Sequence, residues 1–328
     1  MNTRKFGTQG PDVSEIGLGT WQLGSADWGR MRDAEAEEIL NTAVDAGINF
    51  FDTADCYGRG LSETRIGRFL KTCSRPVLVA TKVGRFQEPG WPDNFSQKVF
   101  RKHIENSLRR LQVEALDLTQ LHCLPPDVLK QGDVFDWLRD LKREGKIQRF
   151  GVSVESVEEA RLALEEDGVD SIQIIFNLFR QKPISALFDR VKERGVALIV
   201  RLPLASGLLS GKFSAATGFP ENDHRHFNRN GEHFNVGETF AGVPFETGVT
   251  LVEELRGLVP ALMSLSDMSL RWILDFDAVT VVVPGATRPN QVLANCATSD
   301  LPPLSPELHR RLTRFYDQDV QEHIRGKY

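Results

Sequence analysis

One short stretch of the sequence decides the fold and carries its candidate chemistry: Gly47-Ile48-Asn49-Phe50-Phe51-Asp52-Thr53-Ala54-Asp55-Cys56-Tyr57-Gly58. Residues 48–51 form a short apolar run between a glycine that ends a helical pattern and a polar, glycine-containing segment. This pattern predicts a buried strand that leads into an exposed loop. Asp52 ends the strand and Tyr57 follows on the loop, so the stretch predicts a carboxylate close to a proton donor.

Similar apolar runs recur along the chain, and most of them follow residues with helical spacing. The predicted strands cover residues 16–21, 48–52, 76–82, 116–121, 149–153, 171–176, 196–201 and 279–283. They alternate with helices at a spacing of roughly 25 to 40 residues, which is typical of parallel strands joined by crossover helices. Eight buried parallel strands predict an α/β fold of the (β/α)₈ TIM-barrel type, and an open doubly wound sheet is the alternative.

Two further segments complete the predicted barrel. Residues 5–14 contain a glycine and proline turn and predict an N-terminal hairpin that plugs one end. Residues 211–244 form an unusually long loop after the seventh strand, and loops of that length are often lids or mobile segments. The chain has no composition break or linker, so residues 1–328 are expected to form a single domain.

Composition narrows the class of function. A hydrophobic fraction of 41% and a charged fraction of 26% are those of an ordinary globular protein. The formal net charge of −5 argues against a nucleic-acid or anionic-membrane partner. Four scattered cysteines without metal-ligand spacing indicate reduced thiols, and no apolar signal segment occurs. We therefore expect a cytoplasmic protein of unknown oligomeric state.

Four residues could meet at the C-terminal mouth of such a barrel, where active sites are assembled. Asp52, Lys82 and His122 each end a predicted strand, and Tyr57 lies just beyond one of them. A lysine ammonium beside the phenol should lower the pKa of Tyr57, while Asp52 keeps the lysine charged. His122 could orient a carbonyl oxygen. Taken singly, each residue also fits an ordinary structural role.

Three motifs resemble those of the aldo-keto reductase family. Residues 47–67, with Asp-Thr-Ala-Asp-x-Tyr-Gly, resemble its first signature, residues 111–122 its second, and residues 283–295 its cofactor signature. The resemblance covers nearly the whole chain. It implies a tetrad of Asp52, Tyr57, Lys82 and His122 that reduces a carbonyl with a nicotinamide cofactor, and Tyr57 as the general acid.

The resemblance also implies a set of cofactor-binding residues: Gly19, Thr20, Trp21, Asp52, Ser153, Gln173, Arg201, Leu204, Ser206, Lys212, Gly285, Thr287, Arg288, Gln291 and Asn295. Two positions depart from the family pattern. Val154 replaces a common asparagine, and Arg201 stands where an aromatic ring often stacks on the nicotinamide. Arg201 could stack as a plane, or it could bind an anionic group of the substrate.

The choice between NADP and NAD rests on a single cation. Gly285 and Gln291 stand where some family members bind the 2′-phosphate with basic residues. Arg288 is the nearby cation, and its guanidinium suits a phosphate. We expect NADP, with NAD as the alternative.

Other side chains have weaker signals. His224, His226 and His233 lie on the long loop without supporting acids or cysteines, so we expect a solvated loop and no metal site. An apolar substrate pocket could be lined by Trp28, Phe86, Trp91, Phe213, Phe227 and Phe234.

We expect an NAD(P)H-dependent carbonyl reductase or alcohol dehydrogenase acting on an aldehyde, ketone or sugar. One alternative is a cofactor-binding regulatory protein of the same fold with little turnover. Another is a lyase in which Lys82 forms a Schiff base, although Asp52 beside it would keep the amine protonated.

Overall fold

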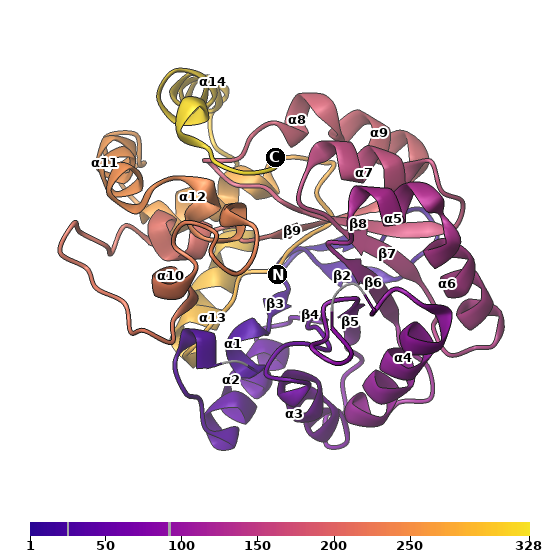
Figure 1. The fold of residues 1–328 in the computed structure, drawn as a ribbon. Helices are drawn as coiled ribbons and strands as arrows, with labels where there is room; N and C mark the ends of the chain where they lie inside the picture. Colours follow the sequence, from indigo (N-terminus) through magenta and orange to yellow (C-terminus); the bar gives the residue numbers. More distant parts are fainter. Residues whose placement is uncertain (25, 91–92) are drawn as a thin grey trace.

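A computed structural model describes residues 1–24, 26–90 and 93–328 of the protein (Figure 1). Eight parallel strands form one sheet in which each strand pairs with its neighbours in the chain. They are β3 (Leu18–Gly19), β4 (Phe50–Asp52), β5 (Leu78–Val83), β6 (Leu118–His122), β7 (Phe150–Ser153), β8 (Val169–Ile175), β9 (Ala197–Arg201) and β10 (Val281–Val282). Parallel bridges from Ile16 to Val282 and from Gly19 to Gly285 join the first strand to the last. The barrel is therefore closed, and the open-sheet alternative is wrong.

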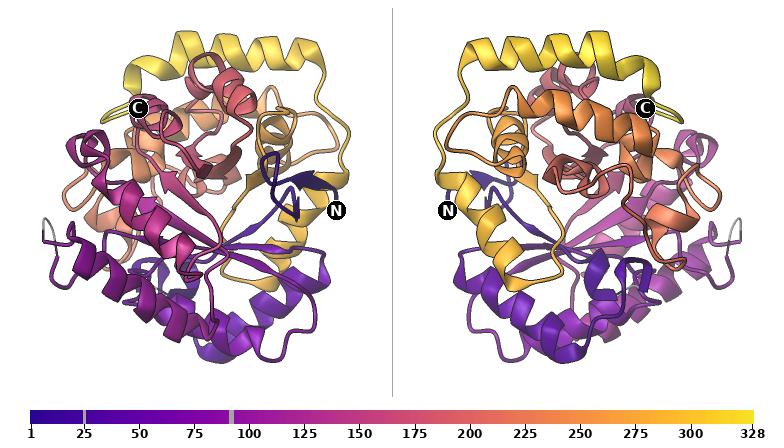
Figure 2. Two further views of the ribbon diagram at one scale, coloured as in Figure 1. Left: turned by 90° about the vertical axis from the view of Figure 1, so that its right-hand side faces the viewer. Right: turned by 90° about the vertical axis from the view of Figure 1, so that its left-hand side faces the viewer.

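Helices surround the barrel (Figure 2). The longer ones are α2 (Asp33–Asp45), α3 (Leu61–Leu70), α4 (Gln97–Leu111), α6 (Asp133–Arg143), α7 (Val157–Leu164), α9 (Phe188–Arg194), α11 (Phe245–Arg256), α12 (Leu265–Leu274), α13 (Pro289–Ala297) and α14 (Pro306–Phe315). Short helices α1 (Trp21–Gly24), α5 (Pro126–Gln131), α8 (Pro183–Ala186) and α10 (His224–Phe227) lie in the connections. Within the described residues, no helix has the length and apolar character needed to cross a membrane.

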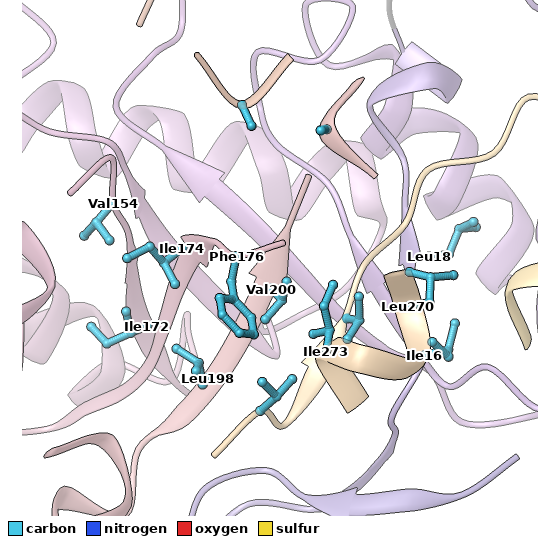
Figure 3. Packing of buried hydrophobic residues seen from close by; sticks show 14 of the residues in the cluster. Ile16, Leu18, Val154, Ile172, Ile174, Phe176, Leu198, Val200, Leu270 and Ile273 are labelled. Carbon is cyan, nitrogen blue, oxygen red and sulfur yellow. The ribbon is translucent and has the colours of Figure 1, made fainter. Parts of the chain in front are cut away.

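The alternation of side chains along each strand explains which residues reach the site. Phe50 of β4 belongs to a small apolar cluster inside the barrel, whereas Phe51 belongs to the larger cluster between strands and helices. In the larger cluster, Leu198 and Val200 of β9 pack with Leu270 and Ile273 of α12 (Figure 3). Because successive side chains of a strand point to opposite faces, the residue two positions after an inward apolar residue is also inward. This rule places Asp52, the last residue of β4, inside the barrel at the C-terminal end of the strands.

The N-terminal hairpin consists of β1 (Thr3–Lys5) and β2 (Asp12–Ser14), which pair antiparallel as predicted. Phe6 and Val13 are buried in the inner cluster. The Phe6 ring lies 5.8 Å from the ring of Phe50. The hairpin thus contributes apolar side chains to the barrel interior from the end away from Asp52.

The first strand is shorter than predicted, because the chain turns at Thr20. The Thr20 amide and hydroxyl both donate to the backbone oxygen of Asp52, at 2.9 and 2.8 Å. Trp21 then begins α1 instead of extending the strand.

The long loop after β9 contains η2 (Ala205–Ser210), α10, η3 (Val236–Glu238) and η4 (Phe240–Gly242). It packs against the start of the chain, since the ring of His224 lies 4.8 Å from that of Trp21. The loop thereby forms part of the wall above the barrel mouth.

Candidate active site

Lys82 occupies the centre of the site and uses its three ammonium protons on three different acceptors. Its Nζ lies 2.6 Å from Oδ2 of Asp52, 2.8 Å from the backbone oxygen of Thr53 and 3.3 Å from the hydroxyl of Tyr57. The side chain of Lys82 is 1% exposed. The ion pair with Asp52 therefore fixes the ammonium beside the phenol.

The second oxygen of Asp52 is held by two amide side chains. Gln173 donates to Oδ1 at 2.7 Å and Gln120 donates to the same atom at 3.3 Å. Ser153 in turn donates to Gln173 at 3.3 Å. Sequence analysis did not identify Gln120, although a signal existed: Gln120 lies two residues before His122, on the same inward face of β6.

The expected lowering of the pKa of Tyr57 is wrong for this structure. Burial raises the pKa of Tyr57 well above its ordinary value, and the negative charge of Asp52 raises it further. Arg201 acts in the opposite direction but does not outweigh these two causes. Tyr57 is therefore protonated at neutral pH, the form that a proton donor needs.

His122 lies next to Tyr57, with the two rings 6.0 Å apart and edge to face. Burial holds the pKa of His122 well below its ordinary value, and the charges of Arg85, Lys82 and Arg201 lower it further. Its Nδ1 lies 3.6 Å from the thiol of Cys56. A neutral imidazole can donate one hydrogen bond into the site without adding a charge.

These side chains border a cleft of about 1060 Å³. Small-molecule sites commonly occupy about 300 to 1000 Å³, so the cleft has room for a cofactor together with a substrate. Eleven of the residues expected to bind the cofactor line it besides Asp52, and they are Gly19, Thr20, Trp21, Gln173, Arg201, Leu204, Ser206, Lys212, Gly285, Thr287 and Gln291.

Two glycines of the cleft wall pack closely against other parts of the chain. A Cβ on Gly285 would lie 2.3 Å from the side-chain nitrogen Nε2 of Gln22, and a Cβ on Gly19 would lie 2.8 Å from the backbone oxygen of Val283. Both glycines line the cleft, so its floor at this point is bare backbone.

Three expected cofactor residues lie elsewhere. Ser153 is buried behind Gln173. Asn295 is buried in α13 and belongs to neither described cavity. Arg288 is exposed at the start of α13 and lines a neighbouring cavity of about 390 Å³, which shares Thr287 with the main cleft.

Aromatic side chains form much of the remaining wall. The Trp21 ring stacks on that of Tyr57 at 5.9 Å. The cleft is also lined by Trp28, Phe86, Phe213, Phe227 and Phe234, as expected for an apolar pocket. Trp91 lies outside the described residues.

The long loop is not uniformly solvated, and His224 corrects that expectation. Its side chain is fully buried, with its ring 4.4 Å from that of Trp28. Burial lowers the pKa of His224 to about 4. His226 and His233 are exposed, as expected.

Four charged side chains form a further group on the cleft wall, which we call the charged quartet: Arg85, Glu155, Arg201 and Glu238. Arg85 donates to Glu155 at 2.6 Å and to Glu238 at 3.0 Å. Arg201 lies 3.6 Å from Glu238. Sequence analysis singled out Arg201 alone, because the other three residues lie in loops after β5, β7 and β9 without a motif.

A closed barrel with an aspartate, a lysine and a tyrosine coupled at its C-terminal mouth defines a class of barrel oxidoreductases. The sequence profile of the aldo/keto reductase family matches residues 15–317, and the chain belongs to this family. Members of the family are NAD(P)H-dependent oxidoreductases. The resemblance noted in the sequence is thus confirmed.

Individual relatives agree over nearly the whole length. The chain is similar to the aldo-keto reductase YhdN of Bacillus subtilis, with 29% identity over 90% of this chain and 87% of that protein. It is also similar to a solved aldo-keto reductase of Bacillus halodurans in its holo form, with 29% identity, 96% coverage of both chains and a TM-score of 0.78. The glycerol dehydrogenase of Gluconobacter oxydans is 27% identical over 99% of this chain and 98% of that chain, with a TM-score of 0.77.

Proposed function

We propose that this protein transfers a hydride between NADP(H) and a carbonyl or alcohol substrate, with Tyr57 as the general acid for reduction and base for oxidation. The observation that carries the proposal is the contact of 3.3 Å between Tyr57 and Lys82 at the wall of a cleft large enough for both ligands. The bound nicotinamide supplies or accepts the hydride. Side chains of this protein supply the proton, stabilise the resulting charge and orient the carbonyl oxygen.

Each member of the tetrad has a distinct task in this proposal. Tyr57 donates its proton to the carbonyl oxygen as negative charge develops there. Lys82 stabilises the phenolate that remains, and Asp52 holds Lys82 in position. His122, neutral at physiological pH, donates a hydrogen bond that orients the carbonyl oxygen. The similarity of the chain to a glycerol dehydrogenase supports the reverse direction, oxidation of an alcohol.

The lyase alternative has little support in this geometry. A Schiff base requires a neutral amine with a free lone pair. The Lys82 ammonium instead donates to Asp52, Thr53 and Tyr57 at once, so a neutral amine would lose a charged partner and a hydrogen bond.

The central test is Tyr57→Phe, with NADPH oxidation measured against a panel of aldehydes, ketones and sugars. We expect turnover to fall by about 10² to 10⁴, the usual contribution of a positioned general acid, and NADPH binding to change little. Tyr316→Phe is the matched control because Tyr316 is buried in the C-terminal segment. If Tyr57→Phe were as active as the unaltered protein, the assignment of Tyr57 as the general acid would be overturned. Tight NADPH binding without any turnover would favour the regulatory alternative.

We also propose that Arg288 makes the protein prefer NADPH. Its exposed guanidinium lines the smaller cavity beside the cleft, together with Arg30. Glu35 and Glu38 also line this cavity, and Arg32 engages the carboxylate of Glu35 at 2.8 Å. The two arginines therefore outnumber Glu38, the remaining acidic side chain among the lining residues. A cavity with two arginines suits the 2′-phosphate that distinguishes NADPH from NADH.

The variant Arg288→Ala should therefore weaken NADPH binding by about tenfold, as expected for one charge-assisted contact, and leave NADH binding unchanged. Fluorescence titration with both cofactors measures the ratio. Arg314→Ala, an exposed arginine of α14, is the control. An equal loss for both cofactors would refute a contact with the phosphate.

A further inference from the structure

The charged quartet lies beside the candidate tetrad on the cleft wall. Arg85 and Arg201 both lower the pKa of His122, which shows that their charges are felt at the tetrad. Arg201 Nη2 also lies 3.6 Å from the thiol of Cys123, the residue that follows His122. The quartet therefore lines the same cleft that a substrate with its carbonyl at Tyr57 and His122 would occupy.

The two positive and two negative charges of the quartet balance each other. Glu238 lies between the two arginines, at 3.0 Å from Arg85 and 3.6 Å from Arg201, and Glu155 takes the other side of Arg85 at 2.6 Å. An anionic substrate group would lose its hydration here and would meet two carboxylates as well as two guanidinium groups. The expectation that Arg201 binds an anion is thus not favoured by its surroundings.

The quartet nevertheless retains hydrogen-bonding capacity. Arg85 engages Oε1 of Glu155 and Oε1 of Glu238. Across residues 1–24, 26–90 and 93–328, the hydrogen bonds to these two carboxylates use Oε1, and Oε2 of each accepts none. Hydroxyl groups are the neutral donors that fit such acceptors, because each hydroxyl donates one proton and can also accept from a guanidinium.

The position of Glu238 is fixed before any substrate binds. Ser206 donates to the backbone oxygen of Glu238 at 3.2 Å and accepts from the amide of Phe240 at 3.1 Å. Its neighbour Gly237 has no room for a side chain, since a Cβ there would lie 2.2 Å from Nη2 of Arg180. Arg85 holds the carboxylate itself at 3.0 Å. A carboxylate whose backbone and side chain are both held binds a hydroxyl with little further loss of conformational entropy.

We propose that the charged quartet is a hydroxyl-binding subsite, and that the substrate is a neutral hydroxyaldehyde or sugar. This inference rests on the proposed function and names its substrate class. The aromatic residues of the cleft suit the same class, because the C–H faces of a sugar pack against rings while its hydroxyls reach polar groups.

The test compares three four-carbon aldehydes with NADPH: erythrose, butanal and succinic semialdehyde. We expect kcat/KM for erythrose to exceed that for each of the others by about tenfold or more, the discrimination that hydrogen bonds to charged groups supply. A kcat/KM for butanal that equals or exceeds that for erythrose would overturn the proposed subsite but leave the proposed reductase function intact. A preference for succinic semialdehyde would also overturn it, in favour of an anion site. No turnover of any aldehyde, ketone or sugar of the wider panel would refute the proposed function itself.

A variant of Glu155 tests whether the charged quartet causes the preference for erythrose over butanal. Glu155→Gln should lower kcat/KM for erythrose about tenfold more than for butanal, because it weakens one acceptor and disturbs the charge balance. Glu158→Gln is the matched control, three residues along the chain, where an exposed carboxylate pairs with Lys182 at 3.2 Å. Equal losses for erythrose and butanal would overturn the role of Glu155. The comparison of aldehydes by the unaltered protein decides the substrate class even if Glu155→Gln does not fold.

Discussion

The buried pair of Lys82 and Asp52 should couple the stability of the barrel to the geometry of its site. Their side chains are 1% and 6% exposed and lie 2.6 Å apart. In Lys82→Met, the hydrogen bonds left to the Asp52 carboxylate among the described residues would be those from the amides of Gln120 and Gln173. We expect Lys82→Met to lower the free energy of unfolding by about 3 to 5 kcal/mol, the usual effect of leaving one buried charge unpaired.

Asp52→Asn should cause a loss of similar size, because it leaves the Lys82 ammonium buried without a counter-charge. The double variant has neither charge and should lose less than the sum of the two single losses. At 2.6 Å the gross attraction is about 6 kcal/mol for an effective dielectric constant of about 20, and desolvation offsets much of it. We therefore expect a coupling free energy of about 2 to 3 kcal/mol.

The free energy of unfolding is measured by equilibrium unfolding in guanidinium chloride, followed by tryptophan fluorescence and circular dichroism. The cycle compares the unaltered protein, the two single variants and the double variant. The pair Arg310 and Glu307 is the control, because its atoms also lie 2.6 Å apart while both side chains are 65% exposed. The same cycle there should give a coupling of about 1 kcal/mol or less. Additive losses at Lys82 and Asp52 would refute the reasoning that burial makes this pair strong.

Two further predictions concern protonation. Because burial raises the pKa of Tyr57, the rate of carbonyl reduction should stay constant across neutral pH, whereas the rate of alcohol oxidation, which needs the phenolate, should rise with pH. Profiles of kcat against pH in both directions measure this. An oxidation rate that falls with rising pH would contradict the prediction. Asp55 is fully buried and none of its carboxylate oxygens has a hydrogen-bond partner among the described residues, and burial raises its pKa well above the ordinary value. The protein should lose stability as pH rises from about 4 through that raised pKa. Asp55→Asn should therefore raise the free energy of unfolding by about 1 to 3 kcal/mol at pH 8 and by much less at pH 4. A Tm that is the same for the variant and the unaltered protein at pH 8 would contradict this.

The parts of the site that lie on strands could be predicted from the sequence, because strand periodicity is a local property. An apolar run identifies each strand, and the alternation of its side chains carries Asp52, Lys82 and His122 to one end of a barrel. Gln120 follows from the same rule. The pKa of Tyr57 could not be predicted in this way, since it depends on how much surrounding chain excludes water from the phenol.

The parts of the site that lie on the long loop could not be predicted from local patterns either. His224 has the polar neighbours of a solvated residue, yet it is buried because its ring packs on Trp21 and Trp28, which lie about two hundred positions earlier in the chain. Glu238 has no motif around it. Its position depends on Ser206 and on two arginines from other parts of the barrel mouth, and such contacts exist only once the barrel has formed.

The charge of Glu238 shows why the long loop is part of the site and not only a cover over it. Arg85 lies two residues after the end of β5 and Arg201 is the last residue of β9, so neither cation belongs to the long loop. Glu155 can balance one of them. Glu238 balances the other, and it is contributed by the loop itself. A loop held away from the barrel would therefore leave a cleft with an unpaired cation next to His122, which would attract anions. With the loop in its observed position, the two carboxylates balance the two guanidinium groups, and the proposed hydroxyl subsite depends on this contribution from the loop.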